Sequence, residues 1–185
     1  MPWNWAGSSA PWGAQVAVAS AQELPLDTLS QTPTVFLGHP RGSGTLLELL
    51  STQPFYVPRA RPGQAIRGIV NRSPRAGESS RYGPTLIAEG APLQLLGEND
   101  PDFALITLIR SRTGQHTVSL FGNRYATTPF LVHQLTDPRP LGDLIFRVYP
   151  PKDRASGCQI ILRVKYLNGR PVDSEYVTHR LLAPR

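Results

Sequence analysis

The sequence predicts an all-β fold, a β-sandwich with one short helix and an irregular N-terminal arm. In several short segments apolar and polar side chains alternate with a period of two, most clearly in residues 158–167. The 19 prolines and 16 glycines supply many turn residues, and proline is costly inside a helix. The 185 residues suffice for one domain with its own core, and a turn about every 8–12 residues is typical of a sandwich or barrel.

Residues 1–30 form the predicted arm, and residues 31–185 form the predicted sandwich domain. All three tryptophans of the chain lie in the arm, at Trp3, Trp5 and Trp12. Each indole can bury on the order of 200 Å² of surface, so we expect these side chains to be covered. The arm either packs on its own domain or docks on a neighbouring subunit, and the sequence leaves both alternatives open.

The first predicted strand of the domain, residues 34–37, is followed by a glycine-rich loop and a helix over residues 45–51. Ser43 or Thr45 can cap the N-terminus of this helix. The loop, residues 38–44, lacks the Lys-Ser/Thr ending of a phosphate-binding loop. Its place before a helix N-terminus nevertheless suits weak anion binding.

The middle of the chain predicts further strands joined by turns. Residues 65–70 are a strand candidate, and residues 71–84 read as an exposed loop. Residues 103–109 are apolar on both faces and therefore predict a central strand. Residues 110–115 form the connection of a hairpin whose returning strand is 116–121.

The last predicted strand pair is residues 144–149 and 158–167, after the segment 128–135 and a proline-rich turn. Cys158, the one cysteine of the chain, is expected to be a small buried core residue. The outward positions of this pair are basic and aromatic, which predicts a packing or contact surface rather than an active site: Arg147, Tyr149, Arg163 and Lys165.

The formal net charge of +6 is carried mostly by arginine. Six arginines concentrate in one stretch, and they are the candidate contacts for an anionic partner: Arg59, Arg61, Arg67, Arg72, Arg75 and Arg81. Arginine pairs with phosphates and stacks on aromatic rings, and Phe55, Tyr56 and Tyr82 flank this stretch, so it suits single-stranded nucleic acid. A solvated basic loop, or a loop that pairs with acidic residues of a neighbouring subunit, remains an equal alternative.

No motif predicts catalysis, a cofactor or a metal. The four histidines, His39, His116, His133 and His179, lack zinc-site spacing. A sheet that made neighbours of His116 and His133 would still place no carboxylate beside them. An enzyme that uses either histidine is therefore the least favoured function. Glu98, Asp100 and Asp102 share one turn but lack the glycine and the later glutamate of a calcium loop.

Part of the sequence resembles the jelly-roll capsid proteins of picorna-like viruses. Gly44-Thr-Leu-Leu-Glu-Leu-Leu50 follows an arm and a first strand, as the early helix of those proteins does, although the arginine expected in that helix is absent. Residues 142–149 and 160–167 are similar to the last two strands of such a jelly roll. The resemblance implies a jelly-roll-like shell subunit without an active site.

These observations favour a structural subunit of a larger assembly, of the viral or phage particle type. Its expected partners are copies of itself or related subunits, contacted through the arm and the arginine-rich loop, with nucleic acid as a further partner. The alternative is a β-sandwich binding module for glycan, peptide or RNA, with Tyr125, Tyr149 and Tyr166 as candidate aromatics on one sheet face. No apolar run reaches the roughly 20 residues of a membrane span, and the N-terminus lacks the basic start of a signal peptide, so we expect a virion or cytoplasmic location.

Overall fold

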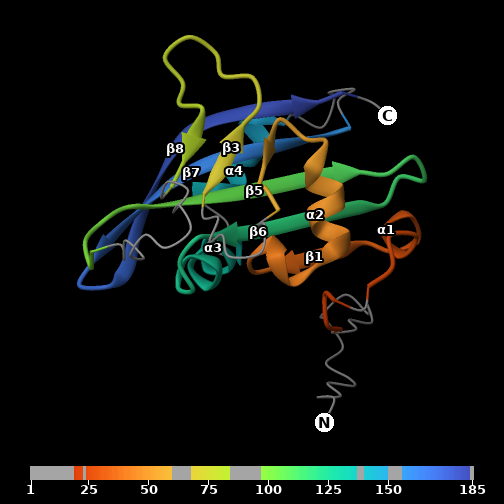
Figure 1. Cartoon of the computed structure of the whole chain (residues 1–185), viewed down its shortest axis with the longest axis horizontal. Helices are drawn as coiled ribbons and strands as arrows, with labels where there is room; N and C mark the ends of the chain where they lie inside the picture. Colours follow the sequence, from red (N-terminus) through yellow and green to blue (C-terminus); the bar gives the residue numbers. More distant parts are fainter. Residues whose placement is uncertain are drawn as a thin grey trace.

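A computed structural model describes residues 19–22, 24–59, 68–83, 97–136, 140–149 and 156–183. These residues form a mainly β protein with two sheets, as predicted (Figure 1). The strands are β1 (Thr34–Leu37), β2 (Phe55–Tyr56), β3 (Ile69–Asn71), β4 (Arg81–Tyr82), β5 (Asp102–Arg110), β6 (His116–Gly122), β7 (Gly157–Leu167) and β8 (Arg170–Leu182). The helices are α1 (Thr28–Gln31), α2 (Gly44–Ser51), α3 (Thr127–Thr136) and α4 (Pro140–Val148), with a 3-10 turn at Pro40–Gly42.

The larger sheet has the strand order β1-β6-β5-β7-β8. The edge strand β1 runs parallel to β6, and the other neighbours are antiparallel. The predicted hairpin of β5 and β6 is confirmed, and β5 is central and almost entirely buried. Strands β7 and β8 form a second hairpin around Asn168 and Gly169, both at positive φ, which is the backbone that a tight two-residue turn requires.

The two faces of the larger sheet carry separate apolar cores, because successive side chains of a strand point to opposite faces. On one face, Leu105 and its neighbours pack against α2 and the small sheet β2-β3-β4, from which Leu50 and Phe55 are fully buried. On the other face, Ile106 and its neighbours pack against α3 and α4, where Leu131 is fully buried. The larger sheet thus lies between the small sheet with α2 on one face and the helices α3 and α4 on the other face.

The predicted strand over residues 144–149 is wrong, because this segment belongs to α4. Leu144, Ile145 and Val148 pack on the core at helical spacing, while Phe146 and Arg147 are exposed. A short apolar run does not separate a buried strand from a helix by periodicity alone. The prediction of a single short helix is also wrong, because this segment forms a helix. The hairpin partner of β7 is β8.

Other predictions of local structure are confirmed. The strand 34–37 forms as expected, and α2 begins after Ser43, whose Oγ accepts the backbone N–H of Leu46 at 3.1 Å. Cys158 is a free thiol in β7 with no exposed surface, and burial raises its pKa to about 12. Jelly rolls are built from antiparallel strands, whereas β1 and β6 of this protein are parallel. The predicted jelly-roll connectivity is therefore not confirmed.

The N-terminal arm is largely outside the described residues, and Trp3, Trp5 and Trp12 lie there. Of the described part of residues 1–30, Leu29 is buried and Leu24 packs against the core beside α2. The boundary between arm and domain therefore stays a prediction. In the described part of the chain, every helix is too short or too polar to cross a membrane.

Candidate functional site

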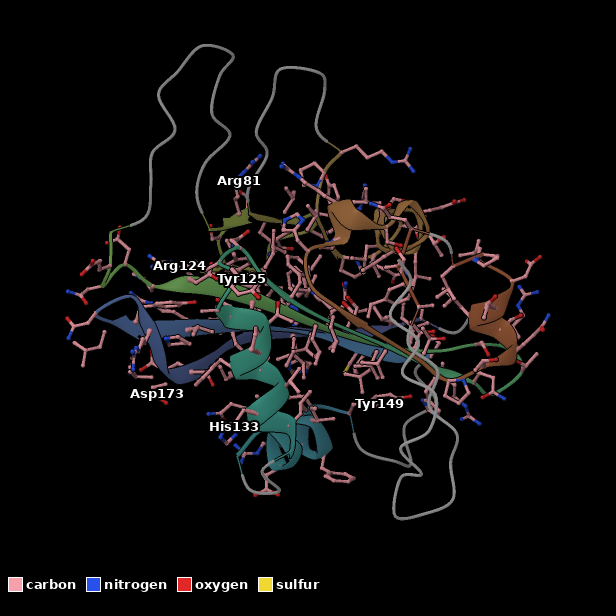
Figure 2. All side chains as sticks on the ribbon, turned by 90° about the horizontal axis from the view of Figure 1, so that it is seen from below. Arg81, Arg124, Tyr125, His133, Tyr149 and Asp173 are labelled. Atoms are coloured by element: carbon pink, nitrogen blue, oxygen red, sulfur yellow. The ribbon has the colours of Figure 1, made fainter. Side chains whose placement is uncertain are left out.

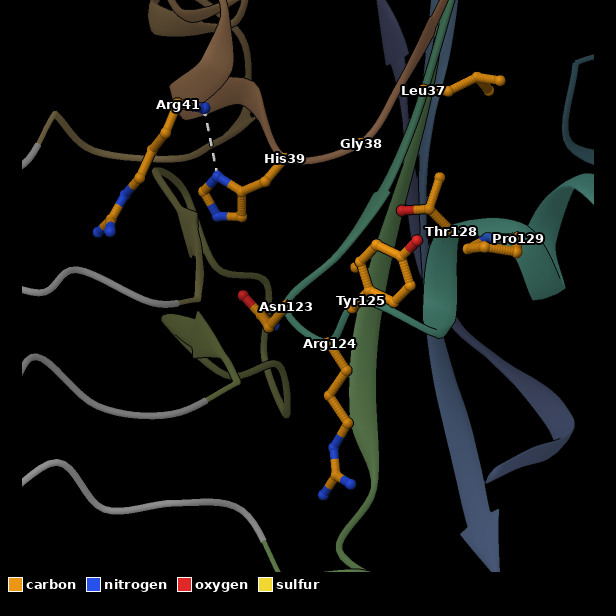
Figure 3. A pocket seen from close by; sticks show the side chains of 10 residues that line it. Leu37, Gly38, His39, Arg41, Asn123, Arg124, Tyr125, Thr128 and Pro129 are labelled. Carbon is orange, nitrogen blue, oxygen red and sulfur yellow. Dashed lines mark hydrogen bonds between the residues drawn. The ribbon is translucent and has the colours of Figure 1, made fainter. Parts of the chain in front are cut away.

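A cavity of about 800 Å³ opens at the carboxyl ends of β1 and β6 (Figure 3). One wall comes from the end of β1 and the loop after it: Leu37, Gly38, His39 and Arg41. The other wall comes from the end of β6 and the start of α3: Gly122, Asn123, Arg124, Tyr125, Thr128 and Pro129. This volume is in the roughly 300–1,000 Å³ range of small-molecule sites.

The topology of the sheet explains why the cavity lies there. Strands β1 and β6 are parallel neighbours, with Leu37 opposite Leu120. After β1 the chain crosses to α2 on one face of the sheet, and after β6 it crosses to α3 on the other face. Two adjacent parallel strands whose connections diverge in this way leave a crevice at their carboxyl ends, where open α/β sheets bind ligands.

A buried carboxylate fixes the loop between β6 and α3. Asp102, at the start of β5, is fully buried. Its carboxylate accepts hydrogen bonds from Asn123 Nδ2 at 3.1 Å, from the backbone N–H of Arg124 at 2.9 Å and from Thr127 Oγ1. Gly122 is required here, because a Cβ at this position would clash with Thr127 Cγ2. The loop therefore has one well-determined backbone path.

Tyr125 is the exposed tip of this fixed loop, with 95% of its surface accessible. The side chain of Arg124 turns away from it, as Figure 3 shows, and its guanidinium lies 4.3 Å from the centre of the Tyr166 ring. The same guanidinium donates to the carbonyl oxygens of Gly97 at 2.6 Å and Asp100 at 2.9 Å. Arg124 thus braces the loop from below, while the phenol of Tyr125 faces solvent at the cavity.

His39 shapes the opposite wall of the cavity. Its ring packs edge-on against Phe121, with 5.4 Å between the ring centres. Its Nδ1 accepts the backbone N–H of Arg41 at 3.2 Å, which places the hydrogen of the neutral ring on Nε2. Gly38 before it has a φ of +110°, in the region that favours glycine.

The edge of the sheet beside the cavity is a second candidate site. Among the described residues β1 pairs with β6 alone, and Val35 and Leu37 are 61% and 59% exposed. The backbone N–H of Gly38 donates to Leu120 at 3.0 Å. Because backbone groups alternate along a strand, those of Val35 and Leu37 point toward the open edge.

The arginines predicted to hold an anionic partner do not gather in one described patch. Arg61 and Arg67 lie outside the described residues, and Arg59 is exposed. The guanidinium of Arg72 donates to the Ser51 carbonyl at 2.6 Å and lies over the Tyr56 ring. Nucleic-acid contact through this stretch stays a prediction.

Arg75 and Arg81 belong to the small sheet and the loop within it. The backbone N–H of Arg75 donates to Glu78 at 2.8 Å, and the backbone N–H of Arg81 donates to Ser79 Oγ at 3.1 Å. Figure 2 shows Arg81 on the side of the larger sheet opposite α3. These arginines therefore lie on the face of the small sheet and not in the cavity.

Glu78 joins that loop to β8. Its carboxylate accepts from the guanidinium of Arg180 and from Thr178 Oγ1, and the Arg180 and Glu78 side chains are 9% and 14% exposed. The Arg180 guanidinium, more than any other group, holds the pKa of Glu78 far below its usual range. This ion pair is a structural tie between the two sheets.

The remaining sequence candidates are dispersed. Tyr166 is buried and Tyr149 is half-buried after α4, so the three tyrosines do not share an exposed sheet face. His133 lies on α3 and His116 on β6, so the two histidines are not neighbours in a sheet. Figure 2 shows Tyr125 and His133 at opposite ends of α3.

The chain matches no protein family model, no curated protein and no solved structure. Sequence reasoning named Tyr125 and the anion-binding tendency of residues 38–44, but it did not bring them together. Only the parallel pairing of β1 with β6 does so. The candidate function therefore rests on the geometry of the cavity and of the β1 edge.

Proposed function

We propose that this protein is a structural subunit of a larger assembly and that its copies associate through the open edge of β1. The observation that carries the proposal is the exposure of Val35 and Leu37 on an edge strand. An exposed apolar edge strand is a template for pairing with another strand, and soluble proteins usually protect such edges with charge.

The charge pattern favours a second copy as the partner. Residues 28–38 contain no ionisable side chain, although the whole chain carries +6. The opposite edge strand, β8, carries the exposed charged residues Arg170, Asp173 and Glu175. Two copies can meet along the neutral β1 edge without like-charge contact, whereas the β8 edge is protected by its charges.

A simple register satisfies both the backbone and the side chains. An antiparallel, two-fold symmetric pair centred on Phe36 places Val35 of one copy opposite Leu37 of the other. The outward backbone groups of these residues then form the hydrogen-bonded pairs of the new ladder. Their side chains share one face and cover each other as cross-strand pairs.

A viral or phage shell is the kind of assembly that the sequence resemblance implies. Of the two stretches compared with the last jelly-roll strands, 160–167 is in β7 and 142–149 is in α4. Pairing through β1 closes a dimer, so a shell needs further contacts, for which the tryptophan arm and the loop 59–81 are the proposed surfaces. Electron microscopy of the purified chain distinguishes closed particles from discrete dimers.

The dimer contact is tested by light scattering after size-exclusion chromatography over a range of concentrations. We expect the full chain to dissociate on dilution and Val35→Lys to be monomeric throughout. Val172→Lys is the matched control, because Val172 is 54% exposed on β8 and receives the same charge.

Two results would overturn this proposal. One is a full chain that stays monomeric at all concentrations. The other is protection of the amides of Val35 and Leu37 from hydrogen exchange in the monomer, since the edge would then be covered within its own chain.

A further inference from the structure

We propose that the cavity between the β1–α2 loop and Tyr125 binds a nucleotide unit, a phosphate attached to a planar base. The unit is either a free mononucleotide or one residue of a single strand, because both offer the same chemistry. The site takes Leu37 from the β1 edge, and the described arginines Arg72, Arg75 and Arg81 of the stretch 59–81 do not line it. The following features of the cavity support this ligand.

The charge of the cavity suits a phosphate. Among the described residues that line it none is acidic. Arg41 contributes a cationic side chain, whereas the guanidinium of Arg124 points away to the carbonyl oxygens of Gly97 and Asp100. The cavity also borders the first turn of the ten-residue helix α3 at Thr128, and that turn contains no acidic residue. The positive end of a helix dipole adds to the attraction for an anion. The Asp102 carboxylate is fully buried below the loop and already accepts three hydrogen bonds from that loop.

The aromatic side of the cavity suits a base. Tyr125 offers an accessible ring, and Leu37 adds exposed apolar surface on the opposite wall. Bases stack on such rings whatever their sequence, since every base has a π face. A simple anion would leave the ring and most of the 800 Å³ unused.

The rigidity of the loop supports a binding role for Tyr125. Fully buried Asp102 and the close approach of Gly122 to Thr127 fix the backbone on both sides of the tyrosine. The phenol itself makes little contact with the protein, so these interactions do not serve to bury it. An aromatic side chain on a preorganised loop loses little conformational entropy when it binds a ligand.

The position of the cavity in the sheet also suits a ligand. It lies at the one described place where neighbouring parallel strands lead to opposite faces of the sheet. That arrangement, and not a local motif, is what creates ligand crevices in open sheets. The loop residues Gly38 and Gly122 keep both walls free of bulky side chains near the strand ends.

The test uses the full chain and three probes: AMP, inorganic phosphate and a short fluorescein-labelled single-stranded oligonucleotide. Calorimetry measures AMP and phosphate, and fluorescence anisotropy measures the oligonucleotide. We expect AMP or the oligonucleotide to bind, and phosphate alone to bind more weakly. Binding of the oligonucleotide without AMP assigns the site to strands, and binding of AMP assigns it to free nucleotides as well.

Two matched pairs of variants locate the binding. We expect Tyr125→Ala to weaken the affinity about 10-fold through lost stacking, and Phe146→Ala, an exposed aromatic on α4, to leave it unchanged. Arg41→Gln should weaken binding and its salt dependence more than Arg112→Gln, which removes the same charge from the exposed β5–β6 turn. Val35→Lys should bind as the wild type does, which separates this site from the self-association.

Three results would overturn the proposal. The first is that neither AMP nor the oligonucleotide binds. The second is that phosphate alone binds as tightly as AMP and the oligonucleotide. The third is that Tyr125→Ala and Arg41→Gln bind as their control variants do, because the charge of the whole chain would then explain any binding.

Discussion

Replacing Asp102 by asparagine tests whether the buried carboxylate holds the cavity wall. In the wild type, Oδ1 accepts from the backbone N–H of Phe103 and from Asn123, and Oδ2 accepts from the backbone N–H of Arg124 and from Thr127. In Asp102→Asn one of these oxygens becomes an NH₂ group. In either orientation, one backbone N–H and one side-chain donor lose their acceptor.

The expected loss of stability follows from the number of donors that lose their acceptor. A buried donor left without an acceptor costs about 1–3 kcal/mol, and the side-chain donor can turn away at a smaller cost. We therefore expect Asp102→Asn to lower the free energy of unfolding by about 2–4 kcal/mol. For a domain of this size that corresponds to a fall in Tm of roughly 5–12 °C.

Thermal unfolding followed by calorimetry measures the effect. Asp100→Asn is the matched control, because Asp100 is exposed and accepts one backbone N–H, that of Gly97 at 2.7 Å. We expect that control to cost less than about 1 kcal/mol. The reasoning is refuted if Asp102→Asn melts within about 2 °C of the wild type or no lower than Asp100→Asn.

Two further predictions concern the rest of the fold. The lowered pKa of Glu78 means that its ion pair with Arg180 stabilises the protein above the unfolded pKa of glutamate and loses this effect as pH falls through the acidic range. Glu78→Gln should therefore cost about 2–3 kcal/mol at neutral pH, and the gap in Tm to the wild type should shrink in acid; a gap that is constant with pH would contradict this. Because Cys158 is buried with its pKa raised to about 12, a thiol reagent should label it only after unfolding, and rapid labelling of the native chain would show that β7 is not packed as described.

The sequence predicted best where structure depends on local pattern. The apolar run 103–109 and the returning segment 116–121, with turn residues between them, identified the β5–β6 hairpin. The cap at Ser43 was readable because it depends on near neighbours, and the burial of Cys158 was expected because free cysteine is among the most buried residue types. The Asn168-Gly169 pair is a strong hairpin signal, and it marks the β7–β8 turn that the sequence analysis missed.

The sequence predictions of secondary structure were wrong where a local pattern fits both a strand and a helix. In 144–149 alternation and helical spacing overlap, and packing of Leu144 and Val148 against the sheet selects the helix. Pro140 at the helix start and Asp143 in the first turn are the local signs that could have corrected the prediction.

By itself, then, the sequence determined a mainly β chain with a basic charge, several of its strands and the cap of α2. Only the tertiary structure decided that β1 lies parallel to β6 at the end of the described sheet, which places the exposed side chains of Val35 and Leu37 next to the cavity at Tyr125. The reason is physical: hydrogen bonding within a hairpin is set by adjacent residues, whereas a parallel pair joins segments far apart in the chain. Such a pair is selected by packing against distant segments, with Phe36 in the core on the α2 side and Leu120 in the core on the α3 side, which a pattern along one segment does not record.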